Sequence, residues 1–208
     1  MSIYKYIAIE GNIGAGKTTL AKFLATAFKG DLLLEEFQEN KFLQCFYQTG
    51  NFAFQSEIQF LLDRSKQLKE YFDLKHDFVI ADYFPSKSLI FSKMNLEHKE
   101  YSIISELHQH LFFLAPKPEL LIFLDRNIDS LFFNIKKRNR SYEQQMDLEY
   151  LSKLSRAYEN WLMTLDIPII RIDADTINLN HPDIIEKNFQ QLFTSNFPKT
   201  QRKVKLMV

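Results

Sequence analysis

The chain has 208 residues, with 26 basic and 26 acidic side chains and a formal net charge of zero. This length suits a single domain, and the balanced charge argues against wholesale binding to nucleic acid or to an anionic membrane. The single cysteine excludes an intrachain disulfide and is typical of a reducing compartment, and no apolar run approaches the length of a membrane span. We therefore expect a cytoplasmic protein.

Short apolar runs alternate with longer helical patterns along the chain. The runs that predict strands cover residues 4–10, 32–35, 78–82, 120–124 and 169–172, and the helical patterns cover 18–28, 51–71, 101–114, 128–137, 148–165 and 181–195. Because the runs are continuously apolar, both faces of the strands should be covered. The pattern predicts an α/β fold of three layers, with a five-stranded parallel sheet flanked by helices. We expect one domain over residues 1–198 and a frayed basic tail over 199–208.

The stretch from Gly11 to Thr18 reads Gly-Asn-Ile-Gly-Ala-Gly-Lys-Thr and lies between an expected strand and an expected helix. That context is the one in which a glycine loop binds phosphate, because glycines let successive backbone N–H groups converge on phosphate oxygens. Lys17 would reach the β- and γ-phosphates, and Thr18 would ligate Mg²⁺. The alternative is a glycine-rich turn without a ligand.

Acidic residues follow two of the expected strands, at the edge of the sheet where ligands bind. Glu35, followed by Glu36, could accept a proton from an attacking hydroxyl or bind Mg²⁺, or the pair could simply end a strand at solvent. Asp82 follows four apolar residues, as a metal-binding aspartate of a phosphate-loop enzyme does. Its alternative role is to cap a helix.

Two further segments carry charge near strand or helix ends. Residues 136–140 place four cations within five residues, which suits a lid that closes on a triphosphate, although a solvated helix end has the same composition. Asn139 in this run suits the left-handed end of a helix. Asp173 and Asp175 follow the last expected strand and either shape an adenine pocket or turn the chain.

In order and spacing, these motifs resemble the deoxynucleoside kinases, especially the bacterial deoxyadenosine/deoxyguanosine kinase branch. The resemblance runs from about Tyr4 to Asp175. The matching segments are 9–19, Glu35, Phe46-Tyr47, Phe54-Gln55, 80–83, 137–140 with Glu143, and 173–175.

The resemblance implies a role for each matching residue. Glu35 would be the general base for a 5′-hydroxyl, and Tyr47 and Glu143 would hold the 3′-hydroxyl of the sugar. Gln55 would read the edge of the base with its amide, and Phe54 with a neighbouring aromatic would sandwich the ring. The implied lid arginines are Arg138 and Arg140, the Mg²⁺ contacts are Thr18 and Asp82, and the ATP-binding residues are Gly11, Asn12, Ile13, Gly14, Ala15, Gly16, Lys17, Thr18, Thr19, Asp173 and Asp175.

The chain departs from the family pattern after the third expected strand. Many members have an acidic residue followed by Arg-Ser there, whereas this chain has Asp82-Tyr83-Phe84. We expect Asp82 and Tyr83 to belong to the substrate site, as in the purine-type bacterial branch. Lys87 is a candidate for the place of the missing arginine.

The leading hypothesis is an ATP-dependent kinase that phosphorylates the 5′-hydroxyl of a 2′-deoxynucleoside, with a purine favoured by the branch resemblance alone. One alternative is a nucleoside monophosphate kinase similar to thymidylate kinase, and another is a non-catalytic nucleotide-binding switch. The family also implies a homodimer, for which the helix expected near residues 101–113 offers apolar side chains.

Overall fold

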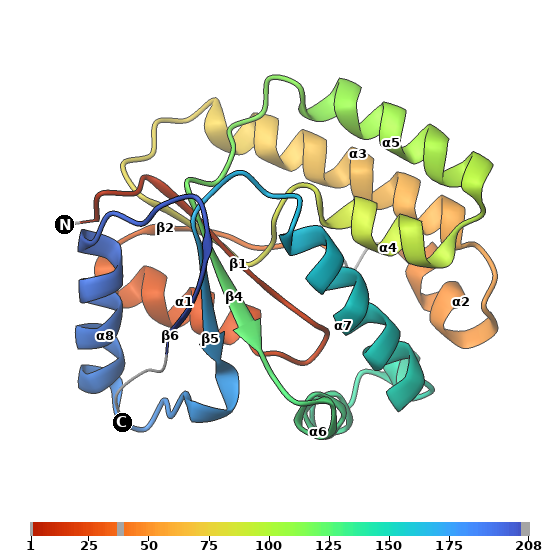
Figure 1. Ribbon diagram of the computed structural model, residues 1–208. Helices are drawn as coiled ribbons and strands as arrows, with labels where there is room; N and C mark the ends of the chain where they lie inside the picture. The colour runs from red at the N-terminus through yellow and green to blue at the C-terminus, as the bar shows by residue number, and fades with distance from the viewer. Residues whose placement is uncertain (1, 37–39, 205–208) are drawn as a thin grey trace.

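The computed structural model describes residues 2–36 and 40–204. Its centre is a parallel sheet whose strands lie in the order β2-β3-β1-β4-β5-β6 (Figure 1). The strands are β1 (Tyr6–Gly11), β2 (Asp31–Leu33), β3 (Val79–Ala81), β4 (Leu120–Asp125), β5 (Ile169–Asp173) and β6 (Gln201–Val204). The predicted α/β class and parallel sheet are confirmed.

The sheet has one strand more than the sequence predicts. Residues 201–204 lie in the tail that we expected to fray, but they pair in parallel with β5, with Ile169 opposite Gln201. Three of the four β6 residues are exposed polar side chains. A charged, exposed strand of this kind is typical of a sheet edge, and it lacks the apolar run by which the other strands were recognised.

The helices are α1 (Lys17–Phe28), α2 (Lys41–Thr49), α3 (Ala53–Phe72), α4 (Lys87–Asn95), α5 (His98–Phe112), α6 (Ile128–Arg138), α7 (Leu148–Leu162) and α8 (Pro182–Thr194). The six expected helices are present, with ends shifted by a few residues. Helices α2 and α4 lie outside the six expected ranges. In α4, three of the buried positions are the polar residues Lys87, Ser88 and Ser92, which obscures an apolar pattern. Among the residues described, no helix is both long and apolar enough to cross a membrane.

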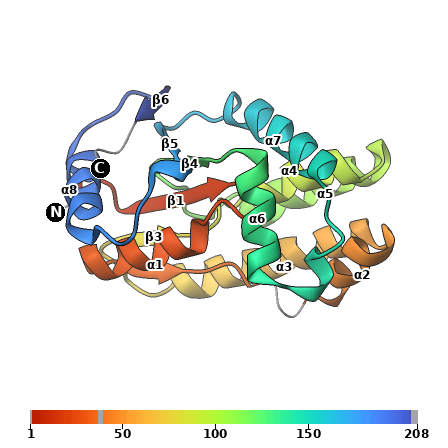
Figure 2. The same ribbon diagram turned by 90° about the horizontal axis from the view of Figure 1, so that it is seen from below.

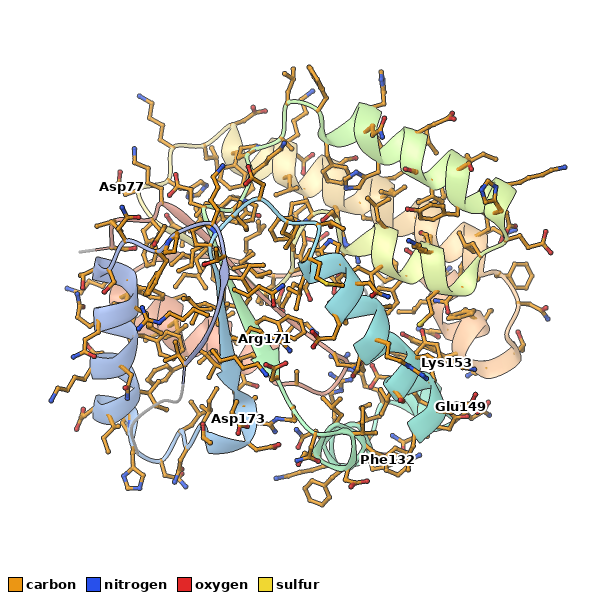
Figure 3. All side chains as sticks on the ribbon, viewed as in Figure 1. Asp77, Phe132, Glu149, Lys153, Arg171 and Asp173 are labelled. Atoms are coloured by element: carbon orange, nitrogen blue, oxygen red, sulfur yellow. The ribbon has the colours of Figure 1, made fainter. Side chains whose placement is uncertain are left out.

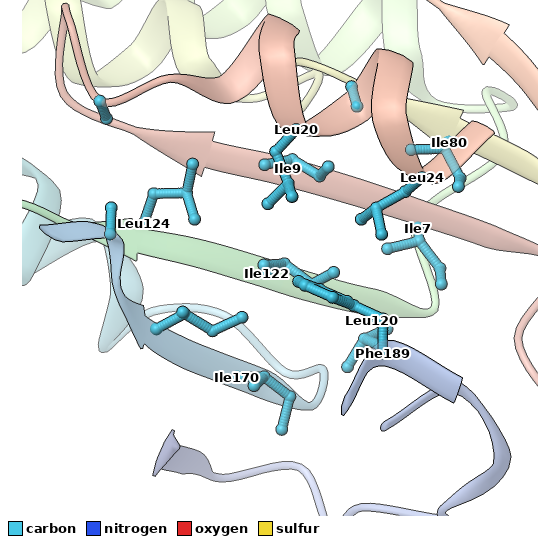
Figure 4. Close-up of a cluster of buried hydrophobic side chains, with 14 of the residues drawn as sticks. Ile7, Ile9, Leu20, Leu24, Ile80, Leu120, Ile122, Leu124, Ile170 and Phe189 are labelled. Atoms are coloured by element: carbon cyan, nitrogen blue, oxygen red, sulfur yellow. The ribbon is translucent and has the colours of Figure 1, made fainter. Parts of the chain in front are cut away.

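Alternate residues of β1 face opposite layers of helices, which explains the continuously apolar strand pattern. Ile7 and Ile9 pack with residues of α1 and α8, as Figure 4 shows for Leu20, Leu24 and Phe189. On the opposite face, Ala8 packs with residues of α4 and α7, and Tyr6 packs with residues of α3 and α5. The two layers are also visible from below the sheet (Figure 2).

Strand β1 lies between β3 and β4, so the loop that follows it opens at the middle of the sheet. Glu10 at the end of this strand is fully buried, and its carboxylate accepts hydrogen bonds from the backbone N–H of Phe84 (2.9 Å) and the hydroxyl of Tyr158 (3.0 Å). These bonds tie β1 to the segment after β3 and to α7. The end of β1, from which the glycine loop begins, is therefore anchored on both sides.

Candidate active site

A cavity of about 630 Å³ opens beyond the carboxyl ends of β1, β2 and β3. Its walls come from the glycine loop, α2, α3, α4 and the segment after α6. The expected site residues that line it are Ile13, Gly14, Gly16, Lys17, Thr18, Thr19, Glu35, Tyr47, Asp82, Lys87, Arg138, Arg140 and Glu143. The fold thus brings these predicted site residues, which lie far apart in the sequence, together in one cavity.

The glycine loop has the backbone conformation that its sequence requires. Gly14 and Gly16 have φ values of 84° and 99°, and a Cβ atom on Gly14 would lie 2.7 Å from the carbonyl oxygen of Leu131. Asn12 and Ala15 are buried, and the Asn12 amide donates to the carbonyl of Leu151 (2.9 Å) on α7. The N–H groups of Ile13 and Ala15 donate to the Asn12 side chain (2.7 Å) and carbonyl (3.1 Å), which holds the loop in shape. The N-terminus of α1, which follows the loop, is the part suited to bind phosphate.

Lys17 is folded back onto the loop that carries it. Its Nζ donates to the carbonyl oxygens of Gly11 (2.7 Å) and Asn12 (3.1 Å). Burial, with repulsion from Lys87, lowers the pKa of Lys17 to about 8. An anionic phosphate in the cavity would offer this ammonium group stronger acceptors than the two carbonyls do.

Asp82 joins the glycine loop to the end of β2. Its Oδ2 accepts a hydrogen bond from the hydroxyl of Thr18, and its Oδ1 accepts one from the backbone N–H of Glu35 (2.7 Å). Helix α4 begins at Lys87, so Asp82 does not cap it. A hydroxyl and a carboxylate beside a phosphate loop fit Mg²⁺, which takes few protein oxygens and completes its shell with water and phosphate.

Glu35 is held by two cations. Its Oε2 accepts from Lys87 Nζ (2.7 Å), and its Oε1 accepts from Arg64 Nε (3.0 Å), while Arg64 also donates to Ser88 Oγ. Burial alone would raise the pKa of Glu35, but Lys87 and then Arg64 lower it to about 2. The carboxylate is therefore ionised and fixed in direction. Lys87 contacts it, and a role for Lys87 in place of the missing arginine stays a prediction.

Sequence reasoning missed Arg64. It lies on α3, four residues after Phe60 and three after Leu61, and all three side chains are buried. A charged residue in the apolar stripe of a helix is a signal for a buried partner, and this signal was available in the sequence.

The segment after α6 carries the expected lid residues. Asn139 has the left-handed conformation predicted for a helix end, with a φ of 56°. The carboxylate of Glu143 accepts from Arg138 Nε (3.1 Å) and Arg140 Nη1 (3.3 Å). Tyr142 stacks on Tyr47 with ring centroids 6.3 Å apart, so the lid closes one side of the cavity against α2.

Three expected substrate residues lie outside the cavity. Gln55 is exposed on α3, and Phe54 is partly buried against the cluster that contains Tyr6. Tyr83 is fully buried and donates its hydroxyl to Gln67 Oε1 (2.7 Å). The aromatic residues that α3 and α4 present to the cavity are instead Phe60 and Phe91, and α3 adds the buried carboxyl group of Glu57.

Asp173 and Asp175 line a second cavity of about 550 Å³. Asp173 ends β5 beyond Arg171 (Figure 3), and its Oδ1 accepts from the backbone N–H of Asp175 (3.0 Å). Asp175 Oδ2 accepts from Asn127 Nδ2 (2.6 Å), which joins the ends of β4 and β5. Both aspartates therefore turn the chain, and a contact with ATP stays a prediction.

The fold and the cavity are those expected of a phosphotransferase, with a glycine-rich loop, a carboxylate held by two cations, and two arginines at the cavity wall. The sequence model of the deoxynucleoside kinase family matches residues 7–195. A deoxyguanosine kinase of Bacillus subtilis is 33% identical over 185 residues, covering 85% of this chain and 89% of that protein. A deoxyadenosine kinase of Dictyostelium discoideum is 35% identical over 176 residues, covering 81% of this chain and 71% of that protein.

Among solved structures, deoxyadenosine kinase from M. mycoides with bound dATP superposes with a TM-score of 0.77 at 26% identity, covering 88% of this chain and 98% of that chain. The chain belongs to the deoxynucleoside kinase family. It is therefore an enzyme that phosphorylates a nucleoside with a nucleotide donor, as the sequence predicted.

Proposed function

We propose that this enzyme transfers the γ-phosphoryl group of ATP to the 5′-hydroxyl of a 2′-deoxypurine nucleoside in nucleotide salvage. The observation that carries the proposal is Glu35, an ionised carboxylate fixed by Lys87 and Arg64 in the same cavity as the glycine loop. The relatives named for deoxyguanosine and deoxyadenosine support a purine.

The reaction would join the 5′-oxygen to the γ-phosphorus and break the bond from that phosphorus to the bridging oxygen of ADP. Glu35 orients the 5′-hydroxyl and receives its proton. With a pKa of about 2, Glu35 is a weak base that is always available. Such a base suits a loose transition state, in which the protein contributes mainly positioning and charge stabilisation.

The remaining residues hold substrate and charge. Lys17 leaves its loop carbonyls for the β- and γ-phosphates, and Arg138 and Arg140 face the transferring group from the lid. Tyr47 and Glu143 lie together at the cavity wall, where they would hold the 3′-hydroxyl. Thr18 and Asp82 would hold Mg²⁺, which neutralises charge on the triphosphate when bound.

Three broader expectations belong to the same proposal. The enzyme acts in the cytoplasm on small molecules rather than on nucleic acid or membranes, and residues 138–146 act as its lid. It forms a homodimer through the region of α5, where Ile103 and Leu107 are exposed and Phe113 and Leu114 follow at 80% and 88% exposure. Light scattering at several protein concentrations measures that assembly.

The decisive experiment is an ADP-release assay with ATP, Mg²⁺ and a panel of acceptors. The panel holds deoxyguanosine, deoxyadenosine, deoxycytidine, thymidine and their monophosphates, with Glu35→Gln as the inactive control. Turnover on a nucleoside that is lost in Glu35→Gln supports the proposal. Turnover confined to monophosphates would assign the chain to the alternative kinase class, and ATP binding without transfer would favour a nucleotide switch.

A further inference from the structure

Glu57 is a buried carboxyl group without a full set of hydrogen bonds. The side chain lines the main cavity, its residue is 6% exposed, and its Oε2 has no hydrogen-bond partner among the residues that the structure describes. A buried acceptor that is left unpaired destabilises the folded protein. Because Glu57 lies at the wall of a substrate cavity, a bound substrate could supply the missing hydrogen-bond donor.

The charged and titratable groups that face Glu57 come from five segments. They are Arg64 on α3 itself, Lys87 on α4, Glu35 after β2, Tyr47 on α2 and Tyr150 on α7. Both cations already bind Glu35, and Arg64 also binds Ser88. Burial outweighs the attraction of Arg64 and Lys87 and raises the pKa of Glu57 to about 7.

Glu57 and Glu35 line the same cavity from different segments of the chain. Arg64 contacts Glu35, which marks the place of the 5′-hydroxyl, and Glu57 precedes Arg64 by two turns on the same buried face of α3. Seven helical residues rise about 10 Å along the axis, so Glu57 and Arg64 lie at different places on the cavity wall. The aromatic rings of Phe60 on α3 and Phe91 on α4 also line this cavity, and the Arg64 guanidinium lies 4.6 Å from the centroid of the Phe60 ring.

We propose that Glu57 reads the base and selects guanine. Once the Glu57 carboxyl group is ionised, it only accepts hydrogen bonds, and the Watson–Crick edge of guanine presents two adjacent donors, N1–H and the N2 amino group, which would stabilise that ionised form. Adenine presents one donor and one acceptor there, so it leaves a carboxylate oxygen against the N1 lone pair. The inference rests on the proposed function and adds to it a preference for deoxyguanosine over deoxyadenosine.

The test compares kcat/KM for deoxyguanosine and deoxyadenosine in the wild-type enzyme and in Glu57→Gln. Glutamine keeps the shape but offers one donor and one acceptor, which complements adenine. We expect the deoxyguanosine/deoxyadenosine ratio to fall by at least about tenfold, because a site with an unmatched polar group rejects a substrate strongly. Glu57→Asp, which remains acceptor-only, should keep deoxyguanosine ahead at reduced kcat/KM.

Two further variants make the comparison specific. Glu70→Gln makes the same chemical change on the same helix at an exposed side chain paired only loosely with Lys66 (3.9 Å), and it should leave the ratio unchanged. Gln55→Ala tests the residue that the family resemblance favours. An unchanged ratio in Glu57→Gln, or a shift in Gln55→Ala instead, overturns the inference.

Calorimetric binding of both nucleosides separates this inference from the proposed function. If the wild-type enzyme binds deoxyguanosine more tightly than deoxyadenosine, and Glu57→Gln reverses that order, Glu57 reads the base even where no phosphoryl transfer is measured. Turnover with the same base ratio in both proteins keeps the kinase and rejects the role of Glu57. Failure to bind either nucleoside rejects both.

Discussion

Glu35 and Glu57 are buried carboxyl groups in one cavity, yet their surroundings shift their pKa values in opposite directions. Glu35 has a cation on each oxygen, which lowers its pKa to about 2. Burial raises the pKa of Glu57 to about 7, and its Oε2 lacks a partner within the described residues. If Glu35 faces the reacting hydroxyl and Glu57 faces the base, as proposed, the protein itself supplies the partners of the first group and leaves a place for the substrate at the second.

The largest expected effect comes from removing the paired carboxylate. Glu35→Gln should lower kcat by about 10²–10⁴-fold, because the 5′-hydroxyl loses its acceptor. The change also leaves Lys87 and Arg64 without their counter-charge, which costs about 3–5 kcal/mol of folding free energy. Steady-state kinetics and urea unfolding of the same preparation measure the two effects. A variant that unfolds as the wild type does and keeps its turnover would remove Glu35 from the chemistry.

The next largest effect should come from removing one of the two cations that pair with Glu35, which shifts the pKa of Glu35 toward that of the unpaired Glu57. Lys87→Met should raise the pKa of Glu35, because Lys87 is the stronger of the two groups that lower it. In the wild type the group stays ionised far below neutral pH, so kcat/KM should not depend on its titration between about pH 5 and 8. In Lys87→Met, kcat/KM should decline as the pH falls and be about tenfold lower at pH 5 than at pH 8.

Arg64→Lys is the matched variant, since it keeps a cation but loses the planar fork that also reaches Ser88. We expect a smaller decline at low pH than in Lys87→Met. Identical pH profiles for the wild type and both variants would show that the cations do not control the protonation of Glu35.

Glu57 should limit the stability of the free enzyme at alkaline pH. Its pKa is raised in the folded state, so folding favours the protonated form, and that stability is present below the unfolded pKa and lost as the pH rises through about 7. Glu57→Gln should therefore be more stable than the wild type by about 2 kcal/mol near pH 8.5, with the difference shrinking toward pH 5. Urea unfolding across this range measures the difference, and a gap independent of pH would contradict it.

Much of this cavity was predictable from the sequence, and the part that was not has a geometric reason. The glycine loop, Glu35 and Asp82 follow strand ends, where periodicity and topology together locate a residue. Gln55 and Glu57 lie two residues apart on one helix, so they point about 200° apart, and only packing decides which enters the cavity. That packing buries Ser56, Glu57 and Phe60 and exposes Gln55. Helices α2 and α4 and strand β6 lay outside the predicted ranges. In α4 the buried face includes Lys87, Ser88 and Ser92, and β6 is mostly exposed polar residues, so neither has a clear apolar pattern.

Glu143 is the intermediate case between the two carboxylates, and its variant should have the smallest effect. Its partners Arg138 and Arg140 are a third exposed, at 34% and 32%, so water screens the pairs more than at Glu35. Glu143→Gln should lower kcat/KM for a deoxynucleoside about five- to tenfold, because the enzyme would lose about one hydrogen bond to the 3′-hydroxyl. The same variant should act on a 2′,3′-dideoxynucleoside as the wild type does, since that substrate has no 3′-hydroxyl to lose. An equal loss on both substrates would mean that Glu143 works through the lid arginines rather than through the sugar.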